Sequence, residues 1–138
     1  MNTLNFDTGV VKHSINGKYE VEFNPTDVSF AERLWRVFEH LEQKQDSKRK
    51  ALENATTAES FDLARKWDAE MREVIDDVFG GPLCASVFGD TSLYAVANGL
   101  PLWANLMLAV MDEMDAAIIR EKKATDPRIQ KYTKKYHR

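Results

Sequence analysis

The sequence predicts an α+β fold that is mostly α, with an N-terminal β-hairpin followed by a bundle of three long helices and one or two short ones. Three observations predict this class. Alternating apolar residues flank Asn16-Gly17, which is a strong hairpin signal. Two later stretches repeat apolar residues at helical spacing, and a third, residues 100–119, is apolar around more than half of its surface. With 138 residues, the chain is long enough for one domain with its own core.

The predicted hairpin covers residues 4–23. A two-residue Asn16-Gly17 loop would pair Ile15 with Lys18, but the alternation of apolar side chains over residues 19–23 favours a register shifted by one residue. We therefore expect an irregular turn, with either a three-residue loop or a bulge. A further short strand is a candidate near the N-terminus, around Leu4 and Phe6.

The first long helix is predicted at about residues 27–50. Its apolar stripe ends at Leu41, so the polar residues 43–50 are either a solvated extension of the helix or a loop, with an exposed arm for a partner as the alternative. Its candidate N-caps are Thr26, Asp27 and Ser29.

The second long helix is predicted at residues 58–79. Gly80-Gly81-Pro82 ends it, because glycine accepts the left-handed backbone that follows a helix and proline cannot continue one. Two short helical segments are predicted next, at residues 83–88 and 92–98, and Gly99 breaks the chain again.

The third long helix, at about residues 101–124, is the predicted centre of the core. Pro101 fits its first turn. Trp103, Met107 and Met111 widen its apolar stripe so far that it must be covered on two sides, either by the other helices or by another subunit. Asp126-Pro127 interrupts the helix, which divides the chain into a globular domain at 1–126 and a basic C-terminal tail at 127–138, helical or loose.

Charge is unevenly distributed along the chain. Residues 120–138 carry eight basic and two acidic side chains, a net charge of +6, which leaves −9 on residues 1–119. An acidic body with a basic tail favours head-to-tail association, and hence a homo-oligomer, or an acidic partner. The tail also interleaves basic and aromatic residues in a pattern typical of polyanion contacts, with Lys131, Lys134 and Lys135 as the candidates. The acidic body disfavours nucleic acid as the main partner.

The sequence predicts no enzyme, no metal site and no cofactor. Cys84 lies in an apolar segment and is expected to be a buried thiol rather than a nucleophile. The carboxylates at 76–77 and 112–115 lack the Glu-x-x-His pairs of a helical di-metal site. No apolar run is long enough to cross a membrane, and residues 1–7 do not have the pattern of a signal peptide, so a cytoplasmic location is expected.

Two segments resemble a known family. They are residues 5–34, which contain Asn5-Phe6-Asp7 and Phe23-Asn24-Pro25-Thr26-Asp27, and residues 87–103, which open with Val87-Phe88-Gly89-Asp90 and end at Trp103. Together they resemble small tail-region proteins of siphophages and prophages, of the tail assembly chaperone family, in a layout that spans most of residues 4–119.

The resemblance implies a small, mostly helical, non-enzymatic protein that oligomerises and binds the long helical tape measure protein until the tail tube is built. The expected partner is therefore a tape-measure-like or other tail protein, in the host cell cytoplasm. The expected contact surface is the exposed side of the 100–119 helix, around Trp103, Met107 and Met111. The alternatives are a structural tail or connector component of the virion, and a small nucleic-acid-binding or regulatory protein that acts through its basic tail.

Overall fold

A computed structural model of the chain describes residues 1–124 and 127–136, and it confirms the predicted class, α+β and mostly α. The elements in chain order are β1 (Val11–Ile15), β2 (Tyr19–Phe23), α1 (Val28–Glu53), α2 (Thr57–Phe79), α3 (Leu83–Phe88), β3 (Val96–Ala97), β4 (Leu100–Pro101), α4 (Leu102–Lys123) and α5 (Pro127–Tyr136). Among the described residues, no helix combines the length and the apolar character needed to cross a membrane.

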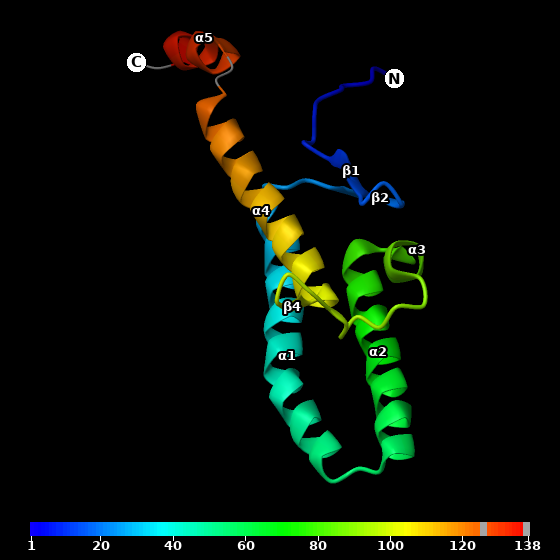
Figure 1. Ribbon diagram of the computed structural model, residues 1–138. Coiled ribbons are helices and arrows are strands. Elements are labelled where there is room, and N and C mark those ends of the chain that lie inside the picture. The colour runs from blue at the N-terminus through cyan, green and yellow to red at the C-terminus, as the bar shows by residue number, and fades with distance from the viewer. Residues whose placement is uncertain (125–126, 137–138) are drawn as a thin grey trace.

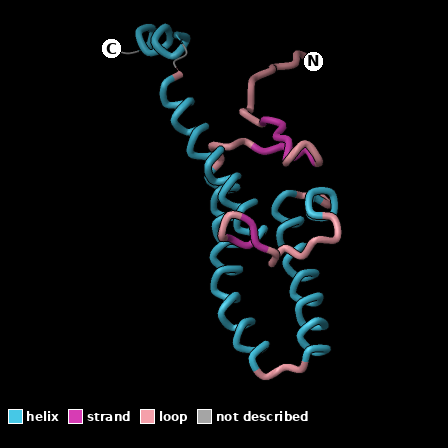
Figure 2. The backbone as a smooth tube through the Cα atoms, viewed as in Figure 1, coloured by secondary structure: helices cyan, strands magenta, loops and turns pink. Residues whose placement is uncertain are grey.

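The helices α1 and α2 form a long antiparallel pair, and α4 lies along the N-terminal half of α1 (Figure 1). The C-terminal half of α4 extends beyond this pair and leads to α5, which lies at the far end of the molecule. The β1–β2 hairpin and α3 lie on the same side of α4, and the short β3–β4 ladder leads directly into that helix (Figure 2).

The hairpin has the predicted register and the predicted irregular turn. Ile15 pairs with Tyr19, while the amide of Lys18 already donates a 3.0 Å hydrogen bond to the Ile15 carbonyl, so two residues of the second strand face one of the first. Asn16 and Gly17 both have positive φ, as a tight Asn-Gly turn requires. The expected strand around Leu4 and Phe6 is absent, and both side chains are exposed.

Helix α1 covers the predicted range and ends three residues beyond it, at Glu53, and its polar residues 43–50 form the helical extension that was one of the alternatives. Asp27 is its N-cap and accepts a 2.9 Å hydrogen bond from the Ser29 amide. Near the other end, Lys48 Nζ donates a 2.8 Å hydrogen bond to Tyr94 Oη and lies over the Trp67 ring. Partial burial lowers the pKa of Lys48, and burial with nearby carboxylates raises the pKa of Tyr94 to about 12. The polar extension thus packs on the body through one lysine.

The predicted stop of α2 is confirmed, whereas the short helix predicted at residues 92–98 is wrong. Gly80 has a left-handed backbone and its amide returns to the Asp76 carbonyl. After α3, the chain forms the two-stranded β3–β4 ladder instead of a helix, because Asn98 and Gly99 both take positive φ and make a second Asn-Gly turn.

One apolar core joins the hairpin to α1, α2, α3 and α4. Stacked rings connect β2 to α1, with the centroids of Phe23 and Phe30 4.5 Å apart.

The C-terminal tail begins with helix α5. Of the two alternatives for the tail, helical or loose, the structure therefore shows the helical one. The predicted helix break at Asp126 and the last two tail residues, 137 and 138, lie outside the described residues.

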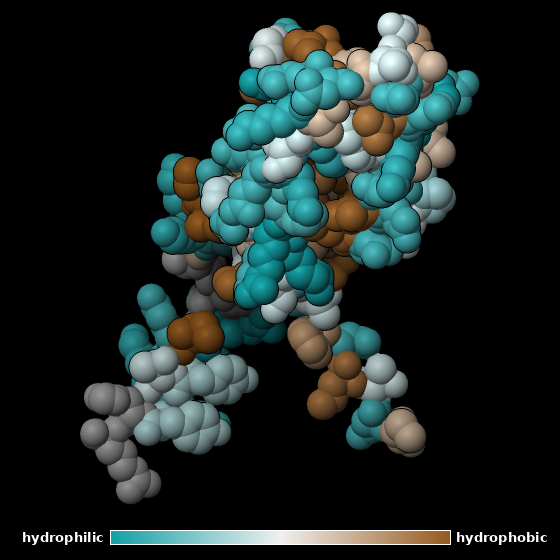
Figure 3. All heavy atoms as spheres, turned by 90° about the horizontal axis from the view of Figure 1, so that it is seen from below, coloured by the Kyte–Doolittle hydropathy of each residue, from teal (hydrophilic) through white to brown (hydrophobic). Residues whose placement is uncertain are grey.

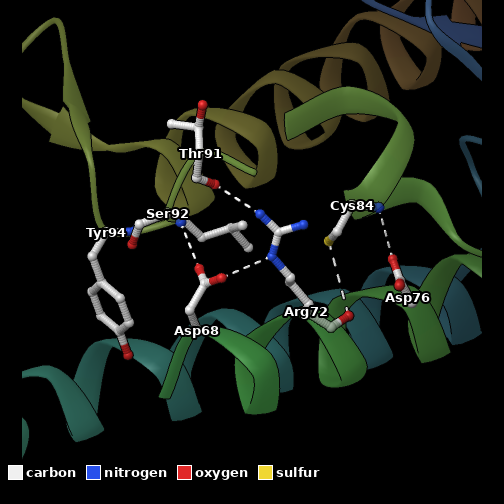
Figure 4. Close-up of polar contacts among 8 residues, drawn as sticks. Asp68, Arg72, Asp76, Cys84, Thr91, Ser92 and Tyr94 are labelled. Atoms are coloured by element: carbon white, nitrogen blue, oxygen red, sulfur yellow. Dashed lines mark hydrogen bonds and ion pairs between the residues drawn. The ribbon is translucent and has the colours of Figure 1, made fainter. Parts of the chain in front are cut away.

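A polar network ties the loop after α3 to α2 (Figure 4). Asp68 accepts a 2.7 Å hydrogen bond from the Leu93 amide and a 2.9 Å one from Arg72 Nε. Arg72 also donates to the Thr91 carbonyl at 2.7 Å. The side chains of Asp68 and Arg72 are both largely buried. The network therefore fixes the segment that carries the chain from α3 to β3 and α4.

We expect Asp68→Ala to lower the free energy of unfolding by about 2–3 kcal/mol, because it leaves the Leu93 amide and the Arg72 guanidinium without their buried partner. The matched control is Asp62→Ala, which removes an exposed ion pair to Arg65 on the same helix and should cost less than about 0.5 kcal/mol. Urea denaturation of both variants measures the difference, and equal losses would contradict the structural role of the network.

Candidate functional site

A half-open groove of about 520 Å³ lies between the β1–β2 hairpin, α3, the β3–β4 turn and α4. We call it the α4 groove. Its apolar wall is formed by Phe23, Val87, Phe88, Leu102, Leu106 and Val110. Concave, mostly apolar surfaces with a few polar groups at the edge are typical of binding sites.

The far wall of the groove is held by hydrogen bonds between the β3–β4 segment and the first turn of α4. The amides of Leu102 and Trp103 donate to the carbonyls of Ala95 and Leu93, at 2.8 and 3.2 Å. Asn105 Nδ2 donates to the Ala97 carbonyl at 2.9 Å. These bonds satisfy amides that the start of a helix otherwise leaves unpaired. The groove wall is therefore fixed before any ligand binds.

Two titratable side chains lie close together at one end of the groove. His13 Nε2 of β1 lies 3.9 Å from Glu113 Oε1 of α4, and the same oxygen accepts a 2.7 Å hydrogen bond from Arg120. The His13 ring stacks on Phe23 at a centroid distance of 4.3 Å, and its Nδ1 is buried without a hydrogen-bond partner. In the part of the chain that the structure describes, no hydroxyl or thiol is hydrogen-bonded to the buried Nδ1 of His13.

Cys84 lies in the first turn of α3 and is fully buried. Its amide donates to Asp76 Oδ1 at 2.9 Å, and its thiol approaches the Arg72 carbonyl at 3.9 Å (Figure 4). Burial, together with the Asp76 carboxylate, raises the pKa of the thiol to about 12. A thiol that stays protonated at neutral pH is neither a nucleophile nor a ready metal ligand. Among the described residues, no three histidine, cysteine or acidic side chains converge to hold a metal ion.

The predicted contact surface around Trp103 and Met107 needs a correction. Trp103 is 2% exposed and Met107 is 0% exposed, so both belong to the core, and Met111 is half-buried against it. The Trp103 ring packs against Phe38 of α1 at a centroid distance of 5.7 Å. The reason is that the chain's own helices cover this face of α4. The sequence had left open whether the other helices or another subunit would cover it.

The candidate polyanion contacts lie apart from the α4 groove. Lys131, Lys134 and Lys135 are all exposed on α5. Lys131 and Lys135 each lie over the ring of the tyrosine that follows, with Nζ 5.4 and 5.6 Å from the centroids of Tyr132 and Tyr136. The basic and aromatic side chains of the tail therefore share one exposed helix.

Sequence reasoning missed the α4 groove. Its residues come from β1, β2, α3, the β3–β4 turn and α4, and no local pattern brings these segments together. One signal was available. Asn105 is a polar residue inside the apolar stretch 100–111, and in the structure it pins the β3–β4 turn at the edge of the groove.

A comparison with known proteins finds no matching family, no matching curated protein and no matching solved structure.

We expect Met107→Ala to lower the free energy of unfolding by about 2–5 kcal/mol, because it opens a cavity at a fully buried position. The control is Leu108→Ala at the next residue, which is partly exposed and should cost about 1 kcal/mol or less. Urea denaturation measures both. A Met107→Ala protein as stable as the wild type would mean that this face of α4 is not core.

The raised pKa of Cys84 predicts a pH dependence of stability. The folded state holds the thiol proton more tightly than the unfolded chain, whose thiol has a pKa near 9.0. The stabilisation is therefore complete below about pH 9 and is lost as the pH rises towards about 12. We expect the wild type to lose more stability than Cys84→Ala over this range in urea titrations. Parallel pH curves for the two proteins would contradict the assignment.

Proposed function

We propose that this protein is a non-enzymatic phage morphogenesis factor, a tail assembly chaperone or accessory protein that holds a helical segment of a tape-measure-type partner in the α4 groove. The resemblance of residues 5–34 and 87–103 to that family motivates the class of protein. The observation that carries the proposal is the groove itself, a half-open hollow whose apolar wall is partly formed by α4, the most apolar helix of the chain.

The chemistry of the groove favours a helix as the ligand. Its wall offers apolar side chains from β2, α3 and α4, and its edge offers the amides of Asn16, Asn98 and Asn105 and the carboxylate of Glu113. An amphipathic helix fits such a surface, because its apolar stripe fills the groove while its polar flanks meet the edge. The partner binds in the host cell cytoplasm, where the tail is assembled.

The test is a pull-down with tagged protein from cells that express the neighbouring gene cluster, treated with nuclease and analysed by mass spectrometry. We expect a long helical tape-measure-type protein in the eluate. Ala109→Lys places a charge at an exposed position of the groove wall and should weaken this capture by about tenfold or more. The matched control is Leu108→Lys, the same change at the exposed neighbour that does not line the groove.

Other results would replace the proposal. Capture of mature tail or capsid proteins, together with the presence of the chain in purified particles, would indicate a structural virion component. Capture that nuclease abolishes would indicate a nucleic-acid-binding protein that acts through Lys131, Lys134 and Lys135 of α5. Equal capture by Ala109→Lys and Leu108→Lys would remove the groove as the site.

A further inference from the structure

Helix α5 has an apolar stripe that is not covered by its own chain. Ile129, Tyr132 and Tyr136 follow the i, i+3, i+7 spacing of one helix face, and they are 69%, 48% and 72% exposed. Figure 3 shows the segment next to the grey C-terminal residues standing away from the body. A helix of ten residues has little stability of its own in water, so α5 gains most from a surface that covers this stripe.

The charge of α5 is opposite to that of the body. The helix contains four basic residues and no acidic one, whereas residues 1–119 carry a net charge of −9. Lys131 and Lys135 lie against Tyr132 and Tyr136, so positive charge borders the apolar stripe directly. A surface that accepts this stripe must tolerate cations at its edge, and a second copy's acidic body does so.

The α4 groove fits this stripe in chemistry. Its wall is apolar, and Glu113 is the charged residue that α4 contributes to its lining. Exposed tyrosines and an isoleucine at helical spacing are the anchors that helix-binding grooves accept, with the tyrosine hydroxyls left at the polar edge.

The groove is out of reach for the α5 of the same chain. From Glu113, at one end of the groove, α4 continues for another ten residues to Lys123, a rise of ~15 Å. Helix α5 is itself ~15 Å long, with ten residues. If the chain reversed directly after α4, α5 would lie beside residues 113–123 and not beside Leu102 and Leu106 at the other end of the groove.

We propose that α5 of one copy docks its Ile129–Tyr132–Tyr136 stripe into the α4 groove of a second copy. The interface is heterologous, because each copy contributes a different surface, and each docked pair leaves one groove and one α5 open. The protein therefore grows head to tail, into rings or open chains, with its concentration. This inference does not depend on the identity of the partner proposed above.

The test uses the full chain in sedimentation velocity at rising concentration and low salt. We expect the mean mass to increase with concentration, and added salt to weaken the association because the charges at the interface are exposed. Ala109→Lys, which blocks the groove, and the double variant Ile129→Asp/Tyr132→Asp, which spoils the stripe, should each weaken self-association by about tenfold or more. Leu108→Lys should associate as the wild type does.

The decisive measurement is the mixture of the two variants. Ala109→Lys retains its α5, and the double variant retains its groove, so an equimolar mixture should form a 1:1 dimer that neither forms alone. Because the substituted residues are exposed, we expect each variant to fold, and circular dichroism checks this. Any of three results would overturn the proposal. The mixture could stay monomeric, the wild-type chain could stay monomeric at every concentration, or association could require nucleic acid or lipid vesicles. If the double variant no longer self-associates but still captures the partner, self-association through α5 is distinct from the proposed partner binding.

Discussion

The burial of one face of α4 is the constraint on which the rest of the structure depends. Trp103 and Met107 lie on this face and are almost completely removed from water, and each side chain of this size contributes roughly 1.5–3 kcal/mol when it is buried. To cover the face, α1 packs along it through Phe38, and the hairpin and α3 approach it from the other side. Helix α2 contacts both α1 and α3 and so holds these covering segments in place.

The most predictable parts of the fold were those that local chemistry determines. The hairpin register followed from the alternation of Tyr19, Val21 and Phe23, and the end of α2 followed from Gly80. The β3–β4 ladder was missed although Asn98-Gly99 carries the same turn signal as Asn16-Gly17. Strands of two residues are too short to show an alternating pattern, so the Asn-Gly turn was the only signal in the sequence that could have predicted them.

The site was less predictable because burial depends on partners that are distant in the sequence. The apolar stripe of α4 showed that Trp103 and Met107 need cover, but periodicity cannot tell whether the cover comes from α1 or from another molecule. The groove depends in addition on Asp68 and Arg72 of α2, whose hydrogen bonds to Leu93 and Thr91 hold the loop before β3 in place. Such long-range polar contacts leave no pattern in the sequence.

The same geometry explains why this chain has surfaces left over. Leu106 and Val110 of α4 are buried in the core, and together with the half-buried Leu102 they form the floor of a half-open groove. The end of α4 extends past its neighbours and carries α5 away from the core, with its apolar stripe exposed. A half-open groove and an exposed apolar stripe at separate places on one chain favour contacts between molecules over contacts within one. The division between a dense core and a half-open groove is the structural basis of the assembly role that we propose.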